Sequence, residues 1–292
     1  FTSPNKPMFK FQTFIGLSFS DMTIDDISTI DDSTDVSFKS NSFLEFNGVG
    51  GGRNLYVDRL QIIGFHTVFK DTGLINSDTI YMNKVSARGY FYFYDSENSQ
   101  SVCCSFRDMS MGGGHVNGAC FFIAGMNNFV LDTINFVSPS PLFRFKNIAS
   151  RYSTSFIYCK NVKLEWESAH FTFNETPKLI DGDGNYVSVN IVFEGGALYS
   201  TMRYDKNSKL IRLINGAVGN IVFNCGSWQG SCQLGTTGGS IETYAAIQYN
   251  NCVVSEVDKH SFLNDDSPNG KRIIPIIYNN CRATVDGKRR RL

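Results

Sequence analysis

The chain has 292 residues, long enough for one large domain with a sizeable core. Its 27 acidic and 27 basic residues balance, which argues against a nucleic-acid-binding role driven by a basic face. No apolar run reaches the roughly 18 residues of a membrane-spanning helix, so insertion into a membrane is not expected.

The first 50 residues are less regular than the rest. Residues 15–24 (IGLSFSDMTI) and 43–52 (FLEFNGVGGG) are predicted to form the first turn of a repeat and its loops. From residue 55 a short pattern recurs: apolar, any, apolar, then Asn, Asp or Glu, then small or polar residues. Its copies are LYVDRL from 55, IYMNKV from 80, FVLDTINF from 129, LEWESAHF from 164, IVFEGGAL from 191, IVFNCGSW from 221, IQYNNCVV from 247 and IIYNNCRA from 276.

The spacing of the copies indicates the fold. They begin 25 residues apart (55 to 80), then 49 (80 to 129), 35, 27, 30, 26 and 29. The interval of 49 becomes 24 and 25 if Cys104 of CSFRDMSM takes the missing place. A period of about 20–50 residues is typical of a solenoid.

The residues of each copy predict strands. Apolar positions alternate with period two, and they are β-branched or aromatic. The spacing of leucine-rich repeats is absent, and propeller blades need roughly 40–50 residues each. We therefore predict an all-β fold, a right-handed single-stranded parallel β-helix of about ten rungs.

The recurring Asn is predicted to be structural. Stacked rungs place equivalent residues about 4.8 Å apart. Asn tolerates the left-handed conformation of a tight turn, and its amide can bond to the next rung. We assign this role to Asn83, Asn224, Asn250 and Asn279.

The eight cysteines are predicted to be free thiols. None forms a CxxC pair and only four His are present, so no zinc site, other metal or cofactor is expected. Cys252 and Cys281 are predicted to stack in the core, and the scatter of the others fits buried thiols made in a reducing compartment.

Three middle copies carry acids where most other copies carry Asn. In the alignment of the copies, Asp132, Glu167 and Glu194 are level on successive rungs, and Glu165 lies two residues from Glu167. Like charges this close raise at least one pKa, which suits an acid and base pair. Acids on neighbouring rungs would lie about 5 Å apart, close to the carboxyl separation of retaining glycosidases. Acids two rungs apart would lie about 10 Å apart, close to that of inverting glycosidases.

Basic and aromatic residues could complete a binding site around these four predicted catalytic acids. Arg107, Arg144 and Lys163 are candidates for binding substrate, with ion pairing to the acids as the alternative. Trp228 and Tyr199 are candidates for stacking against sugars, with core packing as the alternative. DGDGN at 181–185 is read as a turn because the remaining ligands of a calcium loop are missing.

With the repeats aligned, the chain resembles the right-handed parallel β-helix family and, within it, bacteriophage tailspikes. NNFVLDTINF, NVKLEWESAHF and NIVFNCGSW carry the resemblance, which covers about residues 15–285. It implies a homotrimer on the virion tail, synthesised in the host cytoplasm and acting outside the cell. It also implies a single domain over 1–292, taken from the middle of a longer chain.

The resemblance implies a receptor-binding protein that binds and cleaves capsule or O-antigen of the bacterial surface by acid/base glycoside hydrolysis. A polysaccharide lyase would instead produce an unsaturated uronic acid, with Lys163 and DGDGN as its support. A glycan-binding or adhesive coil would bind without cleavage, and a purely structural fibre would have its acids in ion pairs. These alternatives stay open at the level of the sequence.

Overall fold

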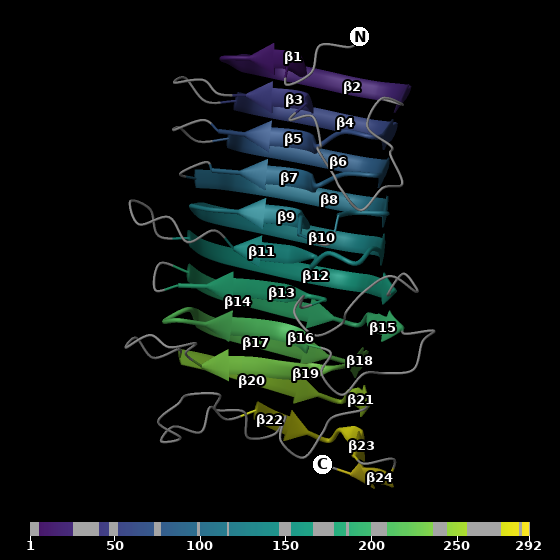
Figure 1. Cartoon of the computed structure of the whole chain (residues 1–292), viewed down its shortest axis with the longest axis vertical. Coiled ribbons are helices and arrows are strands. Elements are labelled where there is room, and N and C mark those ends of the chain that lie inside the picture. The colour runs from purple at the N-terminus through teal and green to yellow at the C-terminus, as the bar shows by residue number, and fades with distance from the viewer. Residues whose placement is uncertain are drawn as a thin grey trace.

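The computed structural model describes residues 6–25, 41–46, 52–72, 77–97, 100–115, 117–145, 153–165, 178–184, 187–199, 209–235, 244–255, 276–285 and 288–291. All regular elements in these ranges are β-strands, stacked along one long axis from β1 to β24 (Figure 1).

A nine-stranded parallel sheet, the short-strand sheet, forms one wall of the stack. Consecutive members are separated in the sequence by a pass through the other sheet, so the chain coils. The members are β1 (Pro7–Phe11), β3 (Ser42–Phe46), β5 (Thr67–Asp71), β7 (Tyr92–Ser96), β9 (Ala119–Ile123), β11 (Phe143–Phe145), β13 (Ile180–Asp183), β16 (Lys209–Ile214) and β19 (Ser231–Gly235).

The long-strand sheet forms the rest of each turn. Its unbroken strands are β2 (Phe14–Asp25), β4 (Gly52–Ile63), β6 (Ser77–Arg88), β8 (Gln100–Gly112), β10 (Met126–Val137) and β12 (Ser153–Glu165). In later turns the strand is divided into β14 (Val187–Glu194) and β15 (Ala197–Tyr199), β17 (Val218–Asn224) and β18 (Ser227–Gln229), β20 (Tyr244–Asn250) and β21 (Val253–Ser255), and β22 (Ile276–Asn279) and β23 (Arg282–Val285). Strand β24 (Lys288–Arg291) pairs antiparallel with β23.

This arrangement confirms the predicted all-β, right-handed parallel β-helix. The register also confirms the missing copy. Cys104 on β8 pairs with Ile80 on one side and with Phe129 on the other. The 49-residue interval is therefore two turns of the coil.

Each long strand turns a corner at a residue in the left-handed conformation, and in the later turns that residue separates the two parts of the divided strand. On β10 this residue is Thr133, with φ of 59°. Phe129 and Leu131 point into the core before it, and Ile134 and Phe136 after it, so alternation shifts by one residue. Equivalent residues are Asp21, Arg59, Lys84, Asp108, Asn161, Gly195, Cys225, Asn251 and Asn280.

For the Asn residues, the predicted hydrogen bonds between rungs are therefore confirmed, and the predicted left-handed conformation was wrong. The left-handed residue is the one after each predicted Asn, as with Cys225 after Asn224. The predicted hydrogen bonds between rungs are present. The Nδ2 atom of Asn250 donates to Asn224 Oδ1 at 2.8 Å, and that of Asn279 donates to Asn250 Oδ1 at 2.8 Å.

Stacked aromatic rings fill much of the core. Phe193, Phe223, Tyr249 and Tyr278 form one stack, with ring centroids 4.9, 4.6 and 5.3 Å apart. Six of the eight cysteines are also buried, Cys252 and Cys281 among them, and all eight are free thiols, as predicted. The exposed two are Cys103 and Cys225.

One copy of the repeat was placed seven residues too late. Phe129 of β10 pairs with Ile157 of β12, and Ile157 pairs with Ile191 of β14. The true copy is IYCKNVKL at 157–164, in place of LEWESAHF from Leu164. The error arises because each strand has a second apolar pair beyond its corner, here Val162 and Leu164, which resembles the first pair.

Candidate functional site

The corrected register changes the predicted column of acids. Asp132 pairs with Lys160, and Lys160 pairs with Glu194. The prediction that Glu167 is level with both was wrong, because lysine takes that place. Glu167 itself lies outside the described residues. Asp132 and Glu194 are therefore two strands apart, about 10 Å between Cα atoms.

Opposite charges alternate along this part of the column. Arg107 pairs in register with Asp132, so successive strands carry Arg107, Asp132, Lys160 and Glu194, a set we call the charge ladder. Asp132 accepts a hydrogen bond from Thr133 Oγ1 at 3.1 Å, and Glu194 accepts one from Asn224 Nδ2 at 3.0 Å. Among the described residues, none of the four forms an ion pair.

Two further predicted site residues lie beyond the corner of β12. The corner is Asn161, and Lys163 and Glu165 both follow it. Lys163 pairs in register with Asn135 and Ala197, and Glu165 pairs with Val137 and Tyr199. The structure therefore places Glu165 and Lys163 on a different face of the coil from Asp132 and Glu194.

Arg144 lies on the short-strand sheet, away from the charge ladder. Its Nε contacts Asp181 Oδ2 at 3.0 Å, and Arg212 Nη2 contacts Asp181 Oδ1 at 2.8 Å. The Asp181 side chain is 4% exposed. This pairing also engages the first acid of DGDGN, so Asp181 is not available as a calcium ligand.

One of the two predicted aromatic platforms, Trp228, does not face solvent. Trp228 is 0% exposed and packs against Phe193 and Phe223, with ring centroids 5.4 and 4.8 Å away. A buried ring offers no face to a sugar, so Trp228 is a core residue. The side chain of Tyr199 lies outside the described part of the chain.

A groove of about 480 Å³ crosses the outer face of the long-strand sheet. It spans β8, β10, β12, β14 and β17, and none of the described residues that line it carries a formal charge. They are Cys103, Cys104, Asn128, Phe129, Val130, Phe156, Ile157, Tyr158, Asn190, Ile191, Val192, Asn220 and Val222.

Outward side chains of the groove form two parallel rows. The first row, in register across the strands, is Asn128, Phe156, Asn190 and Asn220. The second row is Val130, Tyr158, Val192 and Val222. The charge ladder is the next row, two residues further along each strand, or about 7 Å.

Two aromatic side chains dominate the surface of the groove. Phe156 is 58% exposed and Tyr158 is 41% exposed. Water contact of this extent is unfavourable for a phenylalanine ring, so an exposed Phe beside a Tyr makes this groove the candidate binding surface. Sequence reasoning missed both residues because it placed the copy of the repeat seven residues too late. With Ile157 as the inward position, alternation alone points Phe156 and Tyr158 outward.

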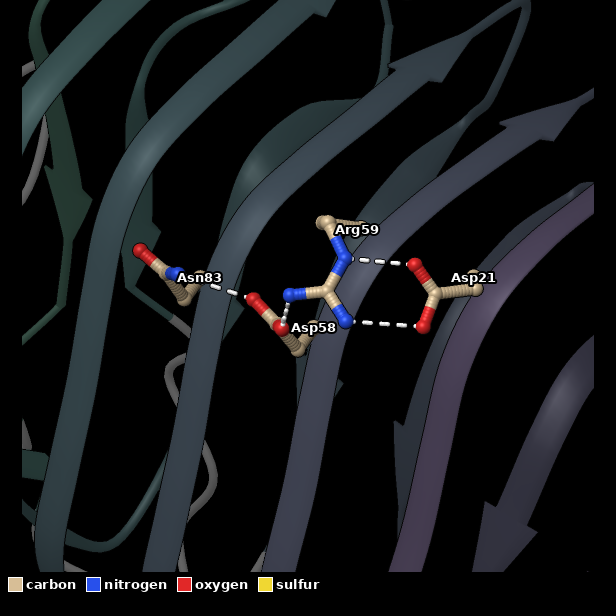
Figure 2. A network of polar contacts seen from close by, with 4 residues as sticks. All are labelled: Asp21, Asp58, Arg59 and Asn83. Atoms are coloured by element: carbon tan, nitrogen blue, oxygen red, sulfur yellow. Dashed lines mark hydrogen bonds and ion pairs between the residues drawn. The ribbon is translucent and has the colours of Figure 1, made fainter.

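Nearer the N-terminus, charged and polar side chains at the corners of β2, β4 and β6 pair with one another (Figure 2). Arg59 donates through Nη2 to Asp21 Oδ2 at 2.7 Å and also contacts Asp58, while Asn83 Nδ2 donates to Asp58 Oδ1 at 2.8 Å. The hydrogen bonds from Arg59 lower the pKa of the Asp21 carboxyl. Here the charges pair with one another, whereas those of the charge ladder form no ion pair with a described residue.

No family model, curated protein or solved structure matches the chain. Within the described ranges, no group of three or more His, Cys, Asp or Glu side chains is placed to hold a metal ion. The same ranges contain no helix long and apolar enough to cross a bilayer.

Proposed function

We propose that this chain is a surface-polysaccharide-binding β-solenoid and that the groove over β8 to β17 holds the glycan. The single observation that carries the proposal is the pairing of exposed aromatic rings with amides in that groove. Phe156 and Tyr158 offer flat apolar faces, which can stack against the C–H face of a sugar ring. Asn190 and Asn220 offer both donors and acceptors for hydroxyl groups.

The rigid frame supports this role. The groove lies on strands whose inward side chains, such as Phe129 and Ile191, are fully packed. Its rows repeat at the strand spacing of about 4.8 Å. A site built on packed strands needs little ordering when it binds, which limits the entropic cost of holding a flexible chain.

Removing the aromatic faces should abolish most of the affinity. We expect Phe156→Ala and Tyr158→Ala each to weaken binding roughly tenfold, because each removes about 1–2 kcal/mol of buried apolar contact. The measurement is calorimetric titration against a panel of purified bacterial capsular polysaccharides and O-antigens. Tyr56→Ala is the matched control, since Tyr56 is 45% exposed on β4 and lies outside the groove. Unchanged affinity in both groove variants would contradict the proposal.

Cleavage of the bound glycan is the second candidate function. Asp132 and Glu194 lie in the row beside the groove, two strands apart, and neither carboxylate is ion-paired with a described residue. A separation of roughly 6.5–9.5 Å between carboxyls leaves room for a water in inverting glycosidases. In this proposal one carboxylic acid protonates the leaving oxygen and the other carboxylate activates water.

Neutralising either acid should then suppress cleavage. We expect Asp132→Asn and Glu194→Gln each to lower the rate of chain shortening by about 10²–10⁴-fold, the usual contribution of general acid–base catalysis. Glu165→Gln is the control beyond the corner. Reducing-end assays measure the rate, and absorbance of unsaturated uronic acid would identify a lyase instead. Full activity in both variants would reject these two residues, and binding without chain shortening would leave an adhesive coil.

The biological setting is part of the same proposal. A polysaccharide-binding coil of this kind suits a receptor-binding protein of a phage tail, which acts on capsule or O-antigen as a homotrimer. The state of assembly is measured by sedimentation equilibrium. A stable monomer across the accessible concentration range would count against the trimer.

A further inference from the structure

The charges beside the groove differ from other charge clusters of the coil because they form no ion pair with any residue that the structure describes. On the short-strand sheet, Arg144 and Arg212 both pair with Asp181, and Glu45 lies 3.0 Å from Lys10. At the N-terminal corner, Arg59 is paired with Asp21 and Asp58, as Figure 2 shows.

The residues of the charge ladder are also in register across neighbouring strands, but they form no ion pairs with described residues. Arg107 and Lys160 are exposed, and Asp132 lies on the strand between them. In the described part of the chain none of the three makes an ion pair. Strand spacing separates the two basic residues by about 10 Å and puts the acid about 5 Å from each.

This alternation would discriminate between anionic glycans that lie along the groove. An anionic group opposite Arg107 or Lys160 gains a charge-assisted hydrogen bond. An anionic group one strand further along meets Asp132 or Glu194 and is repelled. A glycan with a negative charge on every sugar is therefore attracted at two strands and repelled at the other two. A glycan with a charge on every second sugar can place its charges opposite the basic residues alone.

We propose that the groove selects polysaccharides whose anionic groups, such as uronate carboxylates, occur on alternate sugars. Arg107 and Lys160 are the specificity-determining residues, and Asp132 and Glu194 reject uniformly anionic chains. This inference rests on the proposed function, because it assumes that a glycan lies in the groove along the axis of the coil.

The test sorts purified capsular polysaccharides into three classes: anionic on alternate sugars, anionic on every sugar, and neutral. We expect the alternate class to bind tightest, with affinity falling as salt rises. Arg107→Gln and Lys160→Gln should each weaken that class roughly tenfold and weaken neutral glycans far less. Asp132→Asn should strengthen binding of the uniformly anionic class. Lys10→Gln, on the other sheet, is the control of equal charge change.

The outcomes separate the two proposals. If neutral or uniformly anionic glycans bind as tightly as the alternate class, or if the two Gln variants match the unmodified chain, the proposed charge selectivity is wrong while glycan binding stands. If no polysaccharide of any class binds, the proposed function fails and the charge selectivity fails with it.

Discussion

Replacing Trp228 with alanine is expected to destabilise the coil by about 3–5 kcal/mol, the usual cost of truncating a large buried ring. Trp228 is fully buried and packs on Phe193 and Phe223, which belong to the stack of rings that continues to Tyr249 and Tyr278. The cavity would lie against that stack, so the rings cannot close it without losing their own contacts. Denaturant unfolding followed by circular dichroism measures the loss.

Phe156→Ala is the matched control for this prediction. Its ring is 58% exposed, so its removal should change the free energy of unfolding by no more than about 0.5 kcal/mol. A Trp228→Ala variant as stable as the Phe156→Ala variant would show that Trp228 does not pack the core.

Replacing Asp181 with asparagine is expected to cost about 3 kcal/mol of stability. The carboxylate is nearly buried between Arg144 and Arg212, and its loss leaves two guanidinium groups crowded without a counter-charge. Breaking a buried pair typically costs about 3–5 kcal/mol, and the lower end applies because both Arg side chains are partly exposed. The melting temperature and the unfolding free energy should fall together.

Glu45→Gln provides the comparison on the same sheet. Glu45 contacts two more exposed lysines, Lys10 and Lys70, so its loss should cost at most about 1 kcal/mol. Equal destabilisation by the two variants would contradict the importance of burial at Asp181.

Much of the fold follows from the sequence because the repeat is local. Each copy places two apolar side chains inward on one strand, and the interval between copies sets the turn of the coil. The place of Cys104 could be predicted because a simple halving of the 49-residue interval falls on it. The register at Ile157 could not, because the apolar pair beyond the corner at Asn161 imitates the pair before it.

The candidate site depended on that register. Asp132 and Glu194 were found because acids stand out against Asn at the same position of the repeat. Their separation by Lys160, and the groove next to them, appear only when β12 is aligned correctly. Phe156 and Tyr158 were missed for the same reason, and the large aromatic Trp228 attracted attention although burial assigns it to the core.

The cysteines offer a direct report on the groove. Only the thiolate reacts with alkylating reagents, and burial raises the pKa of the Cys232 thiol to about 12 and also raises that of Cys159. Two of the eight thiols are exposed. Cys103 lines the groove, whereas Cys225 lies at the corner of its strand, outside the groove lining.

The decisive measurement is the rate at which Cys103 is alkylated with and without each polysaccharide of the panel, read by mass spectrometry with Cys225 as the internal reference. If the groove binds the glycan, a saturating polysaccharide slows the reaction of Cys103 and leaves that of Cys225 unchanged. If a polysaccharide binds while Cys103 reacts as fast as in the free protein, the glycan lies elsewhere and the groove is not its site.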